Sequence, residues 1–235
     1  MKIKGATVFI TGANRGIGLA LAREALARGA AKVYAGTRKL DGFSEPGVIP
    51  VQIDVTNAES IRRAAAQCAD VSILVNNAGI VELVSDALDD RVEAVTRTML
   101  EVNFFGIVRV TQAFAPVLAE KPQSAVLNVL SDVSWKATSI LTPYSASKAA
   151  AWSYTNHARI ALKEQNTAVV GLHVGFVDTD LTAGVDVPKS NPRDVARKSY
   201  DVLEAGGAEV LADEGTVKLK ASLSAARPEY IYPEG

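Results

Sequence analysis

The chain has 235 residues, of which 48% are hydrophobic and 22% charged, and its formal net charge is -1. This length and balance are typical of a single soluble domain that covers residues 1–235. They provide no bulk electrostatic attraction to nucleic acid or to an anionic membrane, so neither is an expected partner.

Cysteine and histidine are scarce in this chain. Cys68 is the only cysteine, and His157 and His173 are far apart, so neither an intrachain disulfide nor a metal site is expected. The basic N-terminus leads through a short apolar run into a glycine loop, which argues against a signal peptide. No apolar run approaches the roughly 18 residues of a membrane span. A cytoplasmic location follows by default.

The first motif lies near the N-terminus. An apolar run at residues 6–10 predicts a buried strand, and Thr11-Gly-Ala-Asn-Arg15-Gly-Ile-Gly18 leads from it into an alanine-rich helix. Glycines let a backbone approach a pyrophosphate, and a helix N-terminus offers unpaired N–H groups and a positive dipole end. The spacing G-x-x-x-G-x-G is not the commoner G-x-G-x-x-G, but its place between strand and helix predicts a nucleotide site.

The second predicted strand, residues 32–36, ends in Thr37-Arg38. In dinucleotide domains an acid near this point binds the ribose 2′-hydroxyl, whereas an arginine suits a 2′-phosphate. Arg38, with Arg15 in the loop, therefore favours NADP(H) over NAD(H), because a guanidinium fork matches a phosphate. The alternative is that both arginines are merely exposed, and Asp41 lies close enough to weaken the prediction.

Strand and helix patterns alternate along the rest of the chain. Further strands are predicted at residues 48–53, 71–75, 126–130, 167–174 and 208–212. Helices are predicted at about 57–67, at 84–118 in two pieces broken near Asp89, at 144–165 and after residue 191. This alternation predicts an α/β fold: a doubly wound, Rossmann-type parallel sheet of about seven strands with helices on both faces.

Several polar or small residues stand at the ends of these strands. Asp54 lies where adenine would bind, although it could equally be a turn residue. Asn77-Ala-Gly79 would let a ligand approach the backbone opposite the glycine loop. Asn103 is unusual inside a helix, because its amide competes with backbone hydrogen bonds; the alternative is a residue on the helix surface.

Tyr144-Ser-Ala-Ser-Lys148 opens the helix at residues 144–165. Four positions make about one helical turn, so the phenol and the ammonium lie on one face. A cation beside a phenol lowers the phenol's pKa and makes the tyrosine usable as a proton donor or acceptor near neutral pH. The alternative is a solvated pair on a surface helix, because Tyr-x-x-x-Lys is a common accident.

Taken together, these motifs resemble the short-chain dehydrogenase/reductase family, in its single-domain subtype of about the length of this chain. The resemblance covers nearly the whole chain. The combination of Thr37-Arg38 with Arg15 is similar to that of the family's NADP-preferring members. The resemblance rests on the glycine loop, Asn76-Asn-Ala-Gly79, Asn103, Ser131 and the Tyr144/Lys148 pair, in this order.

The resemblance implies catalytic roles for four residues. Tyr144 would be the general acid in reduction and the base in oxidation, with Lys148 lowering its pKa and contacting the nicotinamide ribose. Ser131 would donate a hydrogen bond to the substrate carbonyl, and Asn103 would hold a water that links Lys148 to solvent. Asp132, beside Ser131, departs from the family pattern and brings a charge near the pocket.

The resemblance also implies a set of residues around the cofactor NADP(H). They are Gly12, Asn14, Arg15, Gly16, Ile17 and Gly18 in the loop; Thr37, Arg38, Asp54 and Val55 at the adenosine end; and Asn77, Ala78, Gly79, Tyr144, Lys148, Gly175, Val177 and Thr179 toward the nicotinamide.

The implied activity is that of an NADPH-dependent oxidoreductase with a small carbonyl or alcohol substrate. Such an enzyme is a carbonyl reductase in one direction and oxidises a CH–OH donor in the other. The alternative is a non-catalytic NADP(H) sensor or interaction protein, although such proteins typically lose the active-site tyrosine or lysine. A longer related subtype of sugar epimerases needs a C-terminal substrate domain for which this chain has little room. The resemblance further implies a homodimer or homotetramer built from the helices that contain Asn103 and Tyr144.

Overall fold

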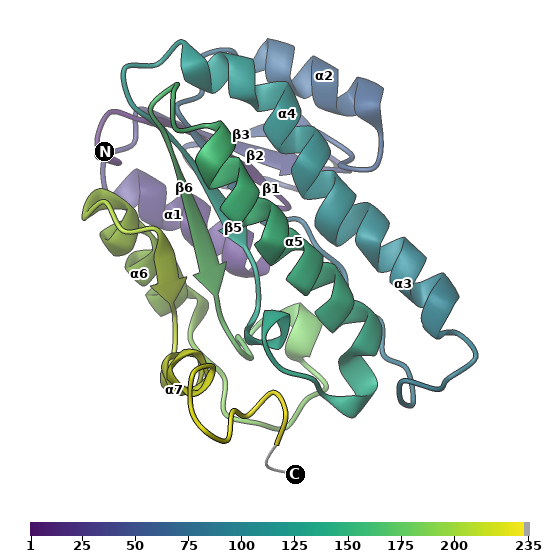
Figure 1. Ribbon diagram of the computed structural model, residues 1–235. Coiled ribbons are helices and arrows are strands. Elements are labelled where there is room, and N and C mark those ends of the chain that lie inside the picture. Colours follow the sequence, from purple (N-terminus) through teal and green to yellow (C-terminus); the bar gives the residue numbers. More distant parts are fainter. Residues whose placement is uncertain (233–235) are drawn as a thin grey trace.

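Seven parallel strands form one sheet in the computed structural model, which describes residues 1–232 (Figure 1). The strands are β1 Thr7–Thr11, β2 Lys32–Thr37, β3 Val48–Gln52, β4 Ile73–Asn76, β5 Ser124–Val129, β6 Thr167–His173 and β7 Glu209–Leu211. Their order across the sheet is β3-β2-β1-β4-β5-β6-β7, and every neighbouring pair is parallel. The predicted doubly wound, Rossmann-type sheet is confirmed.

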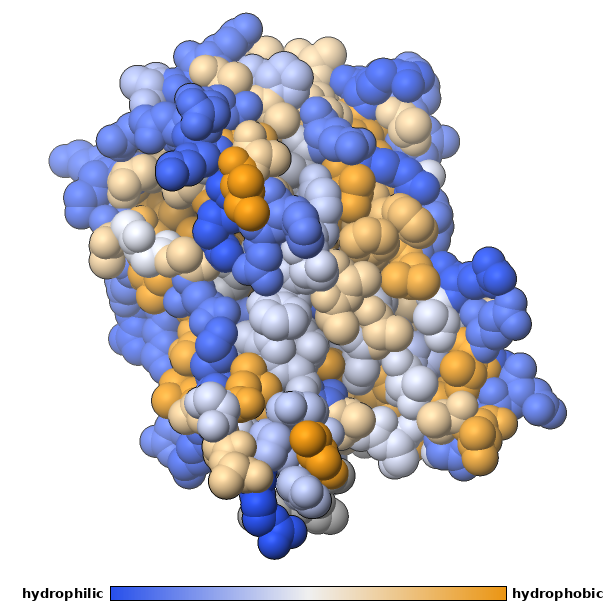
Figure 2. Space-filling model, viewed as in Figure 1, coloured by the Kyte–Doolittle hydropathy of each residue, from blue (hydrophilic) through white to orange (hydrophobic). Residues whose placement is uncertain are grey.

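Helices cover both faces of the sheet. They are α1 Gly16–Ala27, α2 Ala58–Gln67, α3 Val92–Leu100, α4 Gly106–Ala119, α5 Thr142–Ala161, α6 Pro192–Glu204 and α7 Glu214–Ser222. Helices α1 and α6 pack together on one face, while α2, α4 and α5 lie on the other (Figure 1). The outer side of this second layer is mostly hydrophilic, with an apolar strip along α4 and α5 (Figure 2).

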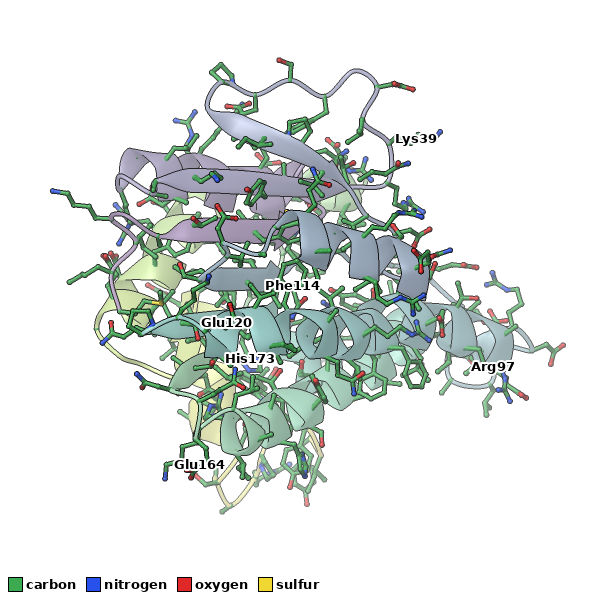
Figure 3. All side chains as sticks on the ribbon, turned by 90° about the horizontal axis from the view of Figure 1, so that it is seen from above. Lys39, Arg97, Phe114, Glu120, Glu164 and His173 are labelled. Carbon is green, nitrogen blue, oxygen red and sulfur yellow. The ribbon has the colours of Figure 1, made fainter. Side chains whose placement is uncertain are left out.

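The core is divided by the sheet, because successive strand residues point to opposite faces. Val8 and Ile10 of β1 pack with the α1 and α6 layer, whereas Phe9 between them faces the other layer. Phe114 of α4 points toward the sheet and contacts Phe9, with ring centroids 4.8 Å apart (Figure 3). Burial on both faces explains why the strands are apolar along their whole length.

Helices α3 and α4 form one continuous helix through a π-helical turn at Glu101–Phe105. The predicted first piece near residue 84 is wrong: residues up to Arg91 form turns, because Asp89 accepts hydrogen bonds from the backbone N–H groups of Ser85 and Arg91. The joined helix, Val92–Ala119, is long and apolar enough to cross a membrane by length and composition. The expectation that no stretch of the chain meets this criterion is therefore wrong. The buried residues of the joined helix pack on the sheet and on α2 and α5, as in the core helix of a globular protein.

Strand β3 lies at one edge of the sheet and contains Pro50. The N–H of Ile53 donates to the carbonyl oxygen of Thr37 on β2, and N–H groups alternate in direction along a strand. The nitrogen of Pro50 therefore faces away from β2. Proline is tolerated there because that position has no strand partner.

Candidate active site

A cleft of about 1020 Å³ lies at the carboxyl ends of the strands. It opens around β1 and β4, where the strand order reverses, and α/β sheets of this type bind ligands at that point. The structure brings the predicted cofactor and catalytic residues together along this cleft, apart from Gly18 and Asn103, which lie behind its wall. No group of three or more His, Cys, Asp or Glu side chains within residues 1–232 is arranged to hold a metal ion.

The glycine loop between β1 and α1 has the backbone that the motif predicts. Gly12 and Gly16 have φ angles of 66° and 56°, which side chains rarely allow. A Cβ on Gly18 would lie 2.5 Å from both Asn77 Nδ2 and the Gly12 carbonyl oxygen. No side chain caps the N-terminus of α1, so its first N–H groups are open to an anion such as a pyrophosphate.

Thr11 and Asn77 hold the glycine loop against the loop after β4. Thr11 Oγ1 accepts hydrogen bonds from the backbone N–H groups of Asn77 and Ala78, each 3.0 Å long. Asn77 Nδ2 donates to the carbonyl oxygens of Thr11 and Gly12, at 2.9 and 3.0 Å. Asn77 therefore braces the cleft as well as lining it. No role was predicted for Thr11, although a threonine at the end of a buried strand is a signal that the sequence offers.

The adenosine end of the cleft is lined by Thr37, Arg38 and Asp54. Thr37 is buried and its hydroxyl donates to the Lys39 carbonyl oxygen. Asp54 Oδ1 accepts from the Thr56 hydroxyl and N–H, and these bonds, with the charge of Arg38, lower the pKa of Asp54. Asp54 thus serves as the turn residue that the sequence left open, while its backbone still lines the cleft.

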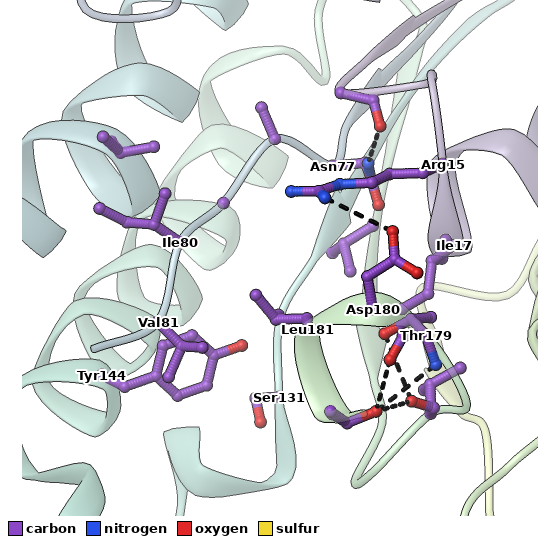
Figure 4. A pocket seen from close by; sticks show the side chains of 18 of the residues that line it. Arg15, Ile17, Asn77, Ile80, Val81, Ser131, Tyr144, Thr179, Asp180 and Leu181 are labelled. Atoms are coloured by element: carbon purple, nitrogen blue, oxygen red, sulfur yellow. Dashed lines mark hydrogen bonds and ion pairs between the residues drawn. The ribbon is translucent and has the colours of Figure 1, made fainter. Parts of the chain in front are cut away.

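The partner of Arg15 in this structure is Asp180, and the expectation that Arg15 and Arg38 reach one phosphate stays a prediction. The Arg15 guanidinium reaches across the cleft to the loop after β6, where Nη1 lies 3.4 Å from Asp180 Oδ2 (Figure 4). Both side chains are mostly exposed, so this ion pair contributes little to stability. The sequence could not reveal it, because the two residues are far apart along the chain.

Ser131, Tyr144 and Lys148 meet in the middle of the cleft. The Tyr144 hydroxyl lies beside Ser131 and points into the cleft (Figure 4). Lys148 lies one turn further along α5, with Nζ 5.6 Å from the centre of the Tyr144 ring. The alternative of a solvated surface pair is excluded, because Lys148 is only 4% exposed.

The expected effect of Lys148 on Tyr144 is not found in this structure. Burial raises the pKa of Tyr144, the nearby Asp132 carboxylate raises it further, and only the Ser131 hydroxyl acts in the opposite direction. Lys148 instead donates from Nζ to the Val129 carbonyl oxygen at 2.8 Å, and burial lowers its own pKa to about 8. Spacing along one helix could not predict this result, because it reports neither the burial of the phenol nor its approach to Asp132.

Asn103 lies in the π-helical turn and is fully buried, which excludes the surface alternative. Its Oδ1 accepts from the Ile80 N–H, and its Nδ2 donates to the Ile80 carbonyl oxygen and to Ser147 Oγ. A Cβ on Gly79 would lie 3.3 Å from Asn103 Oδ1 and 3.8 Å from Lys148 Nζ. The π turn thus holds an amide beneath the loop after β4, close to Lys148.

The far end of the cleft is formed by Gly175, Val177 and Thr179 after β6. The short segment that follows, expected to serve as a lid, lines the cleft, and its Leu181 points into the cleft with half of its surface exposed (Figure 4). Thr182 Oγ1 donates to the carbonyl oxygens of Val177 and Thr179 and holds the lid turn. The contacts of this segment could not be predicted from the sequence, because no local pattern specifies the contacts of a loop.

Comparisons with known proteins agree with this geometry. The model of the family described as short chain dehydrogenase matches residues 6–189. An 11-beta-hydroxysteroid dehydrogenase A of Sesamum indicum is 32% identical over 197 residues, which cover 77% of this chain and 55% of that protein. An uncharacterized oxidoreductase of Staphylococcus aureus is 31% identical over 200 residues, covering 80% of this chain and 86% of that protein.

A solved structure is similar over nearly the whole length. It is a short chain dehydrogenase from Burkholderia cenocepacia in complex with NADP, with a TM-score of 0.91 and 37% sequence identity. The match covers 97% of this chain and 96% of that one. The sheet and the helices around it therefore have the same arrangement as in that short chain dehydrogenase.

Proposed function

The chain belongs to the short-chain dehydrogenase family, and on that premise we propose that it is an NADP(H)-dependent oxidoreductase. It transfers a hydride between NADP(H) and a small carbonyl or alcohol substrate. The observation that carries the proposal is the meeting of Tyr144, Ser131 and Lys148 in the middle of one cleft, beneath the open N-terminus of α1.

Preference for NADP(H) over NAD(H) rests on the adenosine end. Arg38 lines the cleft just beyond the end of β2, where an acid would repel a 2′-phosphate. Asp54 accepts hydrogen bonds from Thr56, and Arg38 acts on it only through its charge, without an ion pair within 4.0 Å. The Arg38 guanidinium is therefore not held by that carboxylate. The similar structure from Burkholderia cenocepacia contains NADP, which supports the same preference here.

The residues of the cleft fit a dinucleotide. The glycines at 12 and 16 leave the loop without side chains beside the helix end, and the cleft runs from Arg38 past the loop to Tyr144. Gly12, Asn14, Arg15, Gly16 and Ile17 would hold the pyrophosphate and its ribose, and Val177 and Thr179 would lie at the nicotinamide. When bound, NADPH supplies the hydride, which no side chain can provide.

The chain's own groups complete the proposed reduction. As hydride arrives, negative charge develops on the substrate oxygen, and hydroxyl donors aimed at that oxygen stabilise it. Tyr144 gives its phenolic proton to this oxygen, and Ser131 donates a hydrogen bond to it. Lys148, one helical turn from Tyr144, would contact the nicotinamide ribose, and Asn103 helps to return a proton along the buried side of the cleft.

Oxidation of NADPH with a panel of aldehydes and ketones tests this function. We expect turnover with the wild type, and none with Tyr144→Phe, which removes the proton donor but leaves the ring. The same Phe variant should bind NADPH with unchanged affinity, measured by the fluorescence of the nucleotide. Turnover by Tyr144→Phe would refute the assigned acid.

The same experiment separates a second candidate, a non-catalytic NADP(H) sensor. The raised pKa of Tyr144 favours this alternative, because a phenol that is hard to ionise is a weak general acid. NADPH binding by the wild type without turnover of any carbonyl or alcohol would establish it. Absence of NADPH binding would contradict both candidates.

A further inference from the structure

The hydrogen of the Ser131 hydroxyl is already engaged in this structure. Ser131 Oγ donates to Asp132 Oδ1 at 3.0 Å, with the Val174 carbonyl oxygen a weaker acceptor at 3.4 Å. The Val133 N–H approaches Ser131 Oγ at 3.4 Å. A serine has one hydrogen, so this hydrogen cannot at the same time serve a substrate oxygen.

Asp132 is held in place as an acceptor. Its Oδ1 also accepts the Val133 N–H at 2.9 Å, and its side chain is 17% exposed at the cleft wall. A hydrogen bond to a carboxylate is stronger than one to a neutral oxygen. While Asp132 is ionised, a substrate carbonyl therefore competes poorly for the Ser131 hydrogen.

The surroundings of Asp132 contain charges of both signs. Lys136 Nζ lies 3.6 Å from Asp132 Oδ2, but Lys136 is shared with Glu229. Asp132 Oδ2 and Asp213 Oδ2 would each lie 3.6 Å from a Cβ on Gly175, so two carboxylates approach one another there. The charged and titratable groups that face Asp132 are thus Lys136, Asp213 and Tyr144, with His173 behind the Ser131 carbonyl and Glu229 behind Lys136.

We propose that Asp132 controls the catalytic serine: the ionised carboxylate captures the Ser131 hydrogen, and Ser131 becomes a donor to the substrate oxygen only when Asp132 is protonated. This inference rests on the proposed function, in which Ser131 donates to that oxygen. It assigns a role to a residue that departs from the family pattern stated for this position.

The proton inventory of this arrangement is balanced. Asp132 takes up one proton from solvent and donates it in a hydrogen bond to Ser131 Oγ, and no covalent bond of the serine changes. The Ser131 hydrogen then turns to the substrate oxygen, and the proton that ends on the product alcohol still comes from Tyr144. The hydride comes from NADPH.

The expected consequence is a reductase that works best on the acid side of the Asp132 titration. Burial and Asp213 raise the pKa of Asp132, whereas Lys136 and the hydrogen bonds from Ser131 and Val133 lower it, and the raising influences prevail. The reductive kcat/KM of the wild type should therefore fall as Asp132 ionises with rising pH. Asp132→Ala should lose this limb of the profile.

A double-mutant cycle tests whether Asp132 acts through Ser131. We expect Asp132→Ala to raise the reductive kcat/KM at neutral pH by about tenfold, since it removes the acceptor of the Ser131 hydrogen. Asp132→Asn should raise it by less, because its amide oxygen is a weaker acceptor than a carboxylate. In the Ser131→Ala background the same changes should have no effect. An equal effect in both backgrounds, or no gain in the wild-type background, would overturn the proposal.

Asp213→Asn is the matched control. It removes the neighbouring negative charge and does not touch Ser131. The amide oxygen can still accept the Thr216 N–H, whereas the bond from the Gly175 N–H to Oδ2 is lost. We expect this variant to keep the pH limb. A profile that changes as much as in Asp132→Asn would show that bulk charge, and not hydrogen capture, is responsible.

A readout without turnover distinguishes failure of this proposal from failure of the proposed function. Ultraviolet difference titration, referenced to Tyr144→Phe, reports the pKa of the Tyr144 phenol. Asp132→Asn should lower that pKa, and by less when Ser131 is replaced by alanine, because a freed serine donates to the phenolate. An equal lowering with and without Ser131 would refute the proposal, even in a protein that reduces no carbonyl.

Discussion

Lys148 lies buried with one hydrogen bond, to a backbone carbonyl. Its pKa of about 8 is below the ordinary value of 10.5, so as pH falls from about 10 to 8 the unfolded chain takes up the proton before the folded one. Folding is therefore weakened below that window by an amount on the order of 3 kcal/mol.

From this we expect Lys148→Met to be more stable than the wild type at pH 7 and to lose turnover. The gain arises because the apolar side chain has no charge to bury, and it should shrink as pH rises above 8. Urea unfolding at pH 7 and pH 10 measures it, with the exposed Lys163→Met as the control. A less stable Met variant at pH 7 would contradict the argument.

Arg38 is the second residue with a clear prediction. Arg38→Asp replaces a cation with a charge that repels a 2′-phosphate, so the ratio of kcat/KM for NADPH over NADH should fall by about tenfold to a hundredfold. Arg15→Ala is the comparison, since Arg15 contacts Asp180 in this structure. If Arg15→Ala changes the ratio and Arg38→Asp does not, the phosphate site has been assigned to the wrong arginine.

Sequence reasoning placed the residues of the site more reliably than their interactions. Tyr144 and Lys148 are a helical turn apart, so one face of α5 could be predicted to carry both. The partners of Arg15 and Ser131 depend on where the lid and Asp132 lie in space. The pKa of Tyr144 depends on burial, which spacing along one helix does not report.

Among the elements, the glycine loop allows the most specific prediction, which concerns Gly18. A Cβ on Gly18 would lie 2.5 Å from Asn77 Nδ2 and from the Gly12 carbonyl oxygen, both of which belong to the brace between two loops. Gly18→Ala should therefore destabilise the protein by about 1–3 kcal/mol and weaken NADPH binding.

Thermal unfolding and nucleotide titration of Gly18→Ala test this claim. Gly184→Ala is the matched control, since a Cβ there would meet no atom within 4 Å. An unchanged unfolding temperature and NADPH affinity in Gly18→Ala would contradict the prediction, because the loop would then accommodate a Cβ without loss of stability or binding.

The elements differ in how well their patterns reveal them. Apolar runs between glycine loops identified the buried strands, because a strand covered on both faces is apolar throughout. Residues 84–91 carry a helix-like pattern, yet Asp89 bonds the local backbone and prevents the helix from starting before Val92. Helix α7 was not predicted, although Asp213 caps it through the Thr216 N–H. The π turn at Asn103 left no signal beyond an amide within a helical pattern.

For the molecule as a whole, the buried His173 makes the free energy of unfolding depend on pH in the acid range. It is fully buried on β6, stacks on Trp135 at 3.8 Å and contacts the Ser131 carbonyl oxygen through Nδ1. Burial lowers its pKa to about 4, below the ordinary 6.5, so as pH falls the unfolded chain is protonated first. Stability should decline between pH 6.5 and 4 by about 3 kcal/mol from this group.

His173→Asn should reduce that decline, because an amide can donate to the same carbonyl without titrating. The lost stacking lowers stability at every pH, so the comparison concerns the slope and not the absolute value. Urea unfolding from pH 7 to 4 measures it, with the exposed His157→Asn as the control. Equal slopes in His173→Asn and the wild type would contradict the assignment.

The overall architecture was predictable from the sequence because strand patterns and helix patterns alternate along the chain. Parallel strands need helical crossovers, so alternation alone implies a sheet with helices on both faces. The site follows in part from the same logic, since strand ends gather at one edge. The position of the lid, and the surroundings of the Asp132 carboxylate, depend on contacts between segments that no local pattern specifies.

The proline on β3 has a consequence for how copies of this protein meet. An open sheet edge is a template onto which a strand of another molecule can add, and such addition leads to aggregates. At Pro50 the outward-facing position has no N–H to offer, so a foreign strand would leave one of its carbonyl groups unbonded. The sheet is thereby protected from edge-to-edge growth on the side of β3.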